Sequence, residues 1–235
     1  MRVAGIDGTK RGWIVVVLEA DRIEAFGIET IGEALDRLSD AESIAIDMPI
    51  GFATAAEVGG RRCEKAARSM LGRGRTSSVF SSPCRAALET VDYPSASAAN
   101  RDSSPHRLGL SKQSHALFPK MRQIDDLMNS SLQDRVFEVH PEVSFTELAR
   151  LAGQTIVGNK KSAAGSSQRI RLLSDAGIPL TTALNQAKVL GAAADDIVDA
   201  AVAAWTARRR ASGIAQRLAE TPDTDAKGLR MEIWF

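Results

Sequence analysis

Short apolar runs, many of them β-branched, alternate with polar turns in the N-terminal part of the chain. The runs over residues 3–6, 13–18 and 22–28 predict three strands, and residues 8–12, a polar segment flanked by glycine, predict a hairpin turn between the first two. The run over residues 43–47 has almost no polar side chain, which is typical of a strand buried on both faces. The pattern therefore predicts the opening of an α/β domain with a mixed sheet.

Helical periodicity appears between and after these strands. Thr30 is a typical N-cap residue, and apolar positions of helical spacing follow it. The clearest helix is the alanine-rich segment 194–212, which is long enough to cross a sheet. Further helices are expected over residues 62–70, 117–132, 145–151 and 167–175, a further strand over 135–140, and a docked tail or short strand over 231–235.

The segment from about residue 59 to residue 102 differs from its surroundings. It is rich in Arg, Ser and Gly and weakly periodic, so we expect one short helix followed by a loop insertion. The chain is then one domain over residues 1–235: an α/β fold with a five-stranded mixed sheet, three antiparallel strands followed by two parallel ones, flanked by helices and interrupted by an insertion at about 55–115.

Composition narrows the class of protein without naming a function. Hydrophobic residues make up 44% and charged residues 25%, as in ordinary soluble domains, and a net charge of +1 predicts no strong overall field. No apolar run is long enough to span a membrane, and the start lacks a signal-peptide pattern, so we expect a cytoplasmic protein. Cys63 and Cys84 are too few for a zinc site. They could form a disulfide, but reduced thiols suit this compartment better.

Four aspartates carry the strongest chemical signal. Asp7 and Asp47 each end a predicted strand, and Asp196 and Asp199 lie three residues apart on the last predicted helix. Ligands of open α/β sheets bind at the carboxyl ends of strands, and crowded carboxylates repel one another unless cations are present. We therefore expect all four to ligate one or two Mg²⁺ or Mn²⁺ ions in a site for phosphoryl transfer.

A purely structural interpretation of the same residues remains open. An aspartate after a strand is often a turn or helix-cap residue. Asp195 and Asp196 could equally complement the positive N-terminal end of the last helix.

Five motifs together resemble a known family. They are GIDGTKRGW at 5–13, IDMPIG at 46–51, RTSSVF at 75–80, EVHPE at 138–142 and DIVDA at 196–200. Their combination is similar to that of the uncharacterised bacterial DUF-type family of predicted RNase H-like nucleases, over essentially the whole chain. The resemblance implies an RNase H-like fold and metal-dependent cleavage of nucleic acid.

Within that superfamily the site pattern resembles that of RuvC-like Holliday-junction resolvases. These carry an Asp on the first strand, an acid ending the fourth strand and Asp-x-x-Asp-Ala on the last helix, which correspond to Asp7, Asp47, Asp196 and Asp199. The resolvases use Glu where this chain has the shorter Asp47, so the number of cations stays open. They act as dimers, so a homodimer is one possibility here.

The EVHPE motif adds three candidate site residues at the end of a predicted strand. His140 could act as a general base or contact phosphate, and Glu138 or Glu142 could be a further ligand. The alternative is a strand-end histidine bonded to backbone, with Pro141 opening a helix.

Basic residues gather in the insertion, which follows the Asp47 strand and could overhang the acidic site. Arginine offers bidentate contacts to phosphate, although most arginine runs are solvated or salt-bridged surface. The candidate phosphate-binding residues are Lys10, Arg61, Arg62, Arg73, Arg75 and Lys120.

Three functions remain to be compared. The sequence favours a metal-dependent nuclease that hydrolyses phosphodiester bonds of DNA or RNA, the type of nucleic acid being undetermined. The second hypothesis is a non-catalytic RNase H-like scaffold that binds nucleic acid or protein. The third is a relative of actin-like phosphotransferases or ATPases, which 235 residues are too few to complete, because those enzymes use two such domains.

Overall fold

In the computed structural model, which describes residues 1–235, the three N-terminal strands form an antiparallel meander. Strand β1 (Arg2–Gly8) pairs with β2 (Trp13–Glu19), and β2 pairs with β3 (Arg22–Ile28). A tight turn joins the first two strands, where the amide of Thr9 donates to the carbonyl of Gly12 at 2.9 Å. The predicted hairpin is confirmed.

Two parallel strands complete the sheet on the other side of β1. Strand β4 (Ser43–Ile46) lies parallel to β1, and β5 (Val136–Glu138) lies parallel to β4. The strand order is β3-β2-β1-β4-β5. The prediction of a mixed five-stranded sheet flanked by helices is therefore confirmed.

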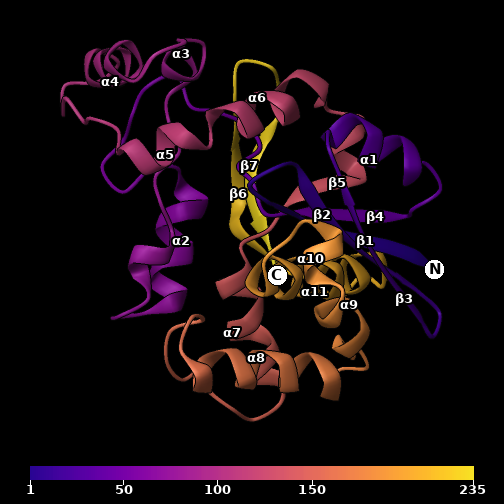
Figure 1. Ribbon diagram of the computed structural model, residues 1–235. Coiled ribbons are helices and arrows are strands. Elements are labelled where there is room, and N and C mark those ends of the chain that lie inside the picture. The colour runs from indigo at the N-terminus through magenta and orange to yellow at the C-terminus, as the bar shows by residue number, and fades with distance from the viewer. The chain divides into compact units, whose positions relative to one another are not determined.

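Helices cover both faces of this sheet, as Figure 1 shows for α1 on one side and α11 on the other. Helix α1 (Ile31–Arg37) begins at Thr30, whose side chain accepts from the amide of Glu33 in a capping box. Helix α11 (Ala194–Ala211) packs mainly on β1, β2 and β4. Its buried face joins the main apolar core, which also includes Val3, Ala45 and Phe137 from the sheet.

The chain divides into two compact units. Unit 1 comprises Met1–Met48, Arg135–Gln216 and Trp234–Phe235, and unit 2 comprises Pro49–Asp134 and Arg217–Ile233. Besides the sheet, α1 and α11, unit 1 contains α7 (Pro141–Leu151), α8 (Ala163–Asp175), α9 (Thr181–Asn185) and α10 (Ala187–Leu190).

Unit 2 is mostly helical and includes a hairpin of two strands. Its helices are α2 (Arg62–Leu71), η1 (Thr76–Ser78), α3 (Arg85–Leu88), α4 (Tyr93–Asp102), α5 (Lys112–Ala116), α6 (Phe118–Leu127) and η2 (Leu132–Asp134), and its hairpin consists of β6 (Arg217–Thr224) and β7 (Arg230–Trp234). Helix α2 packs against β6. An ion network inside the unit joins Arg85 to Asp125 at 2.9 Å and to Asp225 at 2.5 Å.

Several predicted boundaries were wrong. The expected loop insertion contains helices α3 and α4, and the predicted helix over 117–132 ends at Leu127 because the chain is extended at Met128. Helix α7 begins at Pro141 rather than at residue 145, since proline suits the first helical position. Strand β6 was not predicted, because Pro222 interrupts an already weak alternation.

Two further observations concern the whole chain. None of its helices is both long and apolar enough to cross a bilayer. Cys63 and Cys84 are free and buried.

Candidate metal centre

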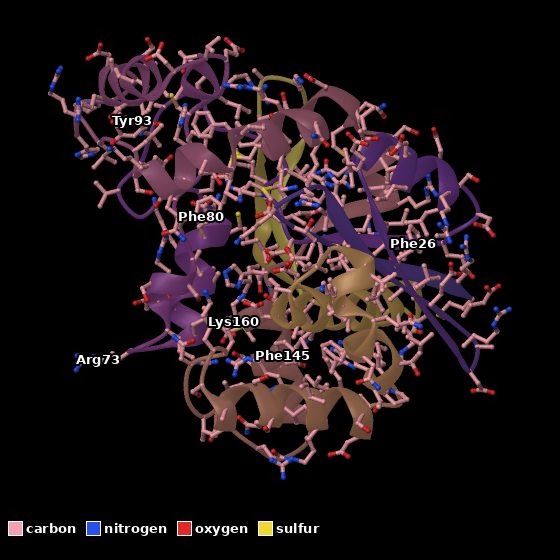
Figure 2. The ribbon with its side chains drawn as sticks, viewed as in Figure 1. Phe26, Arg73, Phe80, Tyr93, Phe145 and Lys160 are labelled. Carbon is pink, nitrogen blue, oxygen red and sulfur yellow. The ribbon has the colours of Figure 1, made fainter.

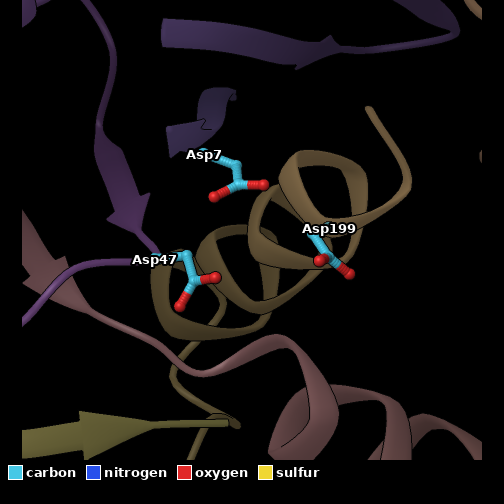
Figure 3. A group of neighbouring side chains, drawn as sticks. All are labelled: Asp7, Asp47 and Asp199. Atoms are coloured by element: carbon cyan, nitrogen blue, oxygen red, sulfur yellow. The ribbon is translucent and has the colours of Figure 1, made fainter. Parts of the chain in front are cut away.

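Three aspartates from three separate segments meet in unit 1. Asp7 lies near the end of β1, Asp47 directly follows β4, and Asp199 lies on α11. One carboxylate oxygen of each lies within 4.8 Å of the others, as Figure 3 illustrates. Asp7 and Asp199 are buried and Asp47 is partly buried.

The sheet places Asp7 and Asp47 side by side. Because β1 and β4 are parallel neighbours, their carboxyl ends lie at the same edge, and the Asp47 amide donates to the carbonyl of Ile6 at 2.9 Å. Alternate residues of a strand point to opposite faces. Val3 and Ala45 belong to the core under α11, so Asp7 and Asp47, at even spacings from them, share that face.

A glycine brings the helix that carries Asp199 close to β1. A Cβ atom on Gly5 would lie 2.1 Å from the backbone oxygen of Ala200 and 2.1 Å from the backbone nitrogen of Ala204. Only glycine therefore allows α11 to approach the strand this closely. The contact begins at Ala200, directly after Asp199, and lies two residues from Asp7, so it holds the two segments that carry these carboxylates close together.

The three carboxylates are poorly solvated and close to one another. Burial raises the pKa of Asp7 well above its ordinary value, and the charges of Asp47, Asp199 and Asp196 raise it further. Burial likewise raises the pKa of Asp47 to about 7, opposed by Lys160 and reinforced by Glu142. The pKa of Asp199 rises to about 7 through burial, which Lys160 again opposes. The cluster is thus short of positive charge.

Lys160 is the one basic side chain seen in an ion pair with this cluster, and the sequence did not predict it. Its Nζ lies 2.5 Å from Oδ2 of Asp199, and the lysine side chain is 36% exposed. Figure 2 marks Lys160 in the segment between α7 and α8. Burial lowers the pKa of Lys160, but Asp199, Asp47 and Asp7 together outweigh it and raise the pKa above its usual range. A basic pair just before the Ser162 helix cap was the sole signal in the sequence.

The donor set suits a hard divalent cation. All three groups are carboxylates, the ligands that Mg²⁺ and Mn²⁺ prefer. Oδ1 of Asp199 is buried and has no hydrogen-bond partner, although buried polar atoms are normally satisfied. A cation at the cluster would satisfy that oxygen and offset the repulsion among the carboxylates.

Asp196, the fourth expected ligand, has a different position. Its carboxylate accepts from the amide of Ala193 at 3.0 Å and so caps the start of α11. It is not among the three carboxylates that lie within 4.8 Å of one another, although its charge still raises the pKa of Asp7. The structure thus brings together three of the four predicted ligands.

The EVHPE motif contributes less to the cluster than expected. Glu138 pairs with Ile46 across β5 and β4, and strand alternation turns it to the face opposite Phe137, which belongs to the core under α11. Glu138 is not among the three carboxylates that lie within 4.8 Å of one another. His140 lies between β5 and α7, and Pro141 opens α7, as the structural alternative expected. The role of His140 stays a prediction.

Glu142 is engaged by a buried arginine. Both of its carboxylate oxygens accept from Arg169 of α8 at 2.8 Å, and the arginine side chain is 1% exposed. The pair joins the start of α7 to α8. Glu142 lies close enough for its charge to raise the pKa of Asp47 and Asp199, but its own oxygens are bound to Arg169.

Comparison with known proteins assigns a family. A family model described as "Protein of unknown function (DUF429)" matches residues 5–224. The chain belongs to the DUF429 family. No curated protein and no solved structure matches the sequence. The matched residues of this DUF429 protein include the three aspartates and Lys160.

Two of the predicted phosphate-binding arginines already have partners within unit 2 of the DUF429 chain. Arg61 is buried, and its guanidinium donates to Glu64 at 2.7 Å and to the carbonyls of Ile50 and Gly51. Arg62 is exposed and pairs with Asp223 at 3.2 Å. The structure therefore gives Arg61 a role inside the unit, and its contact with phosphate stays a prediction.

The remaining basic candidates differ in exposure. Arg73 is exposed and projects from the end of α2 in Figure 2, and Lys10 is exposed in the turn between β1 and β2. Arg75 donates to the carbonyl of Leu71 at 3.3 Å, and Lys120 is partly buried on α6. Lys10 belongs to unit 1, as the aspartates do, and the other candidates belong to unit 2.

Proposed function

We propose that this DUF429 protein is a metal-dependent hydrolase of phosphodiester bonds in nucleic acid, with an RNase H-like fold. The observation that carries the proposal is the convergence of Asp7, Asp47 and Asp199 from two neighbouring parallel strands and the last helix. The strand order, an antiparallel meander extended by two parallel strands, supports the same assignment because it is the order expected of that fold.

Asp7, Asp47 and Asp199 would hold Mg²⁺ or Mn²⁺. When bound, such a cation lowers the pKa of a water molecule and stabilises negative charge on a phosphate. The chain itself supplies ligands from rigid elements: a strand, a strand end and a long helix packed on the sheet. Lys160 holds one oxygen of Asp199 and so fixes the orientation of that carboxylate.

The test is a cleavage assay on labelled single-stranded, duplex, hybrid and four-way-junction substrates with Mg²⁺, Mn²⁺ or EDTA. We expect cleavage that requires the metal and is lost in Asp7→Asn, because the charges of Asp47, Asp199 and Asp196 all act on this aspartate. Asp21→Asn is the matched control, since Asp21 is exposed in a turn of the same meander. Metal-independent cleavage, or equal rates in Asp7→Asn and Asp21→Asn, contradicts the proposal.

A protein that cleaves none of these substrates would contradict the nuclease assignment and not the metal site. If the protein binds Mn²⁺ but cleaves none of the substrates, the nuclease assignment fails. The family would then be better described as a scaffold with a metal site.

A further inference from the structure

The two carboxylate oxygens of Asp199 have different surroundings. Oδ2 of Asp199 accepts from the Lys160 ammonium at 2.5 Å, whereas Oδ1 is buried with no hydrogen-bond partner. The Asp199 side chain is 3% exposed, so solvent does little for either oxygen. Oδ2 is therefore bound by the Lys160 ammonium, and Oδ1 is available to a second positive group.

The segment around Lys160 is fixed against the start of α8. The carbonyl of Asn159 accepts from the amide of Ser162 at 2.9 Å and from its hydroxyl at 2.8 Å. A Cβ atom on Gly165 would lie 2.2 Å from that same carbonyl, so only glycine allows this approach. Hydrogen bonds thus fix the backbone on both sides of Lys160. The ammonium reaches Asp199 from this turn.

Charge counting indicates how many ions the site can take. The three carboxylates of the cluster carry a charge of −3 when ionised, and Lys160, which pairs with them, brings the sum over these four groups to −2. One divalent ion makes the cluster neutral, whereas two would leave a charge of +2 in a poorly solvated place.

We propose that the site takes a single divalent cation, held by Asp7, Asp47 and Asp199, and that the Lys160 ammonium occupies the role of a second cation. The inference deepens the proposed function, on whose metal site it rests. It departs from the two-ion arrangement that four acidic ligands would suggest, because Asp196 caps α11 and Lys160 takes its share of the charge.

Removing the lysine should therefore change the metal site in a defined way. In Lys160→Met the side chain keeps its length but loses its charge, and Oδ2 of Asp199 becomes available. We expect the variant either to bind a second ion or to bind the first at least tenfold more tightly. Lys161→Met is the matched control, because Lys161 is the exposed neighbour in the same turn.

The experiment is calorimetric titration of the full chain with MnCl₂ for wild type, Lys160→Met and Lys161→Met, with far-UV circular dichroism to verify folding. Lys160→Gln replaces Lys160→Met if the methionine variant does not fold. One ion per chain in wild type and Lys161→Met, with the change described above in the Lys160 variant, supports the inference. Two ions in wild type, or a Lys160 variant indistinguishable from Lys161→Met, overturns it.

Failure of this inference can be distinguished from failure of the proposed function, because the readout is binding and not cleavage. Metal-dependent cleavage with two ions bound overturns the role of Lys160 and leaves the nuclease assignment intact. One bound ion that depends on Lys160, without cleavage of any substrate, supports the role of Lys160 while the nuclease assignment fails. Wild type that binds no Mn²⁺ overturns both.

Discussion

Each aspartate of the cluster is held where its charged form is poorly stabilised. Burial is the largest cause for Asp7, Asp47 and Asp199, and their mutual repulsion adds to it for Asp7 and Asp199. Lys160 opposes the effect but is a single charge among three acids. Such an arrangement is unfavourable to folding by itself, which is typical of a site built to bind a cation.

The raised pKa values predict a pH dependence of stability in metal-free protein. Asp47 and Asp199 keep protons up to about pH 7 in the folded state, but lose them near pH 4 when unfolded. Between these values the folded state binds more protons than the unfolded state, so the free energy of unfolding falls as pH rises. Relative to Asp47→Asn, we expect wild type in EDTA to lose on the order of 2 kcal/mol between about pH 5 and pH 8.

Urea unfolding of both proteins across this pH range measures the difference, and groups common to both cancel. Saturating Mn²⁺ should restore most of the loss at the upper end, because the cation stabilises the ionised carboxylates. A difference that stays constant, or that moves in favour of wild type as pH rises, contradicts the raised pKa of Asp47.

The individual site residues were not equally predictable. Asp7 and Asp47 could be found because each ends an apolar run, and strand ends of a parallel pair meet. Asp196 and Asp199 share a helix face by spacing alone, yet the place of Asp196 in the first turn also allowed the alternative that it complements the positive N-terminal end of α11. Lys160 could not be predicted, since a residue between two helices is placed by tertiary packing and not by local pattern.

At the level of elements, the contact between α11 and β1 depends on Gly5. We expect Gly5→Ala to cost about 3 kcal/mol or more in the free energy of unfolding, because the added Cβ meets backbone and not a flexible side chain. It should also weaken Mn²⁺ binding, since displacing α11 moves Asp199. Urea unfolding and Mn²⁺ titration measure the two effects.

Gly109→Ala is the control for this substitution. The nearest atoms to its added Cβ belong to the flexible side chains of Arg101, at 3.3 Å, and Ser97, at 3.4 Å. We expect a small change in stability and none in Mn²⁺ binding. If Gly5→Ala behaves like Gly109→Ala, the helix does not depend on this glycine for its position.

The buried pair between α7 and α8 gives a second prediction at this level. Arg169→Met leaves Glu142 buried without its partner, so we expect a loss of about 3–5 kcal/mol in the free energy of unfolding. The double variant Glu142→Gln with Arg169→Met should lose less than the single one, because no buried charge is then left unpaired. Denaturant unfolding measures both.

Arg171→Met on the same helix is the matched control. Arg171 is exposed, and we expect a change within about 0.5 kcal/mol. Equal effects of Arg169→Met and Arg171→Met would show that the buried pair contributes little to stability.

At the scale of the whole molecule, the sequence predicted unit 1 better than unit 2. Alternating and continuous apolar runs located all five strands of the sheet, and helical periodicity located α11. Unit 2 contains helices as short as the four residues of α3 and the five of α5, which are too short to show a clear periodicity, together with a hairpin from a distant part of the chain. Its division from unit 1 could not be predicted, because it depends on contacts between segments far apart in sequence, such as the packing of α2 against β6.

Asp7, Asp47 and Asp199 are proposed to bind one divalent cation together. Anomalous diffraction from crystals of the full chain grown with Mn²⁺ tests this claim most directly, because manganese identifies its own position. We predict one anomalous peak within coordination distance of all three carboxylates, and none there in crystals of Asp7→Asn. Crystals at saturating Mn²⁺ with peaks only elsewhere, or with none, would contradict the claim.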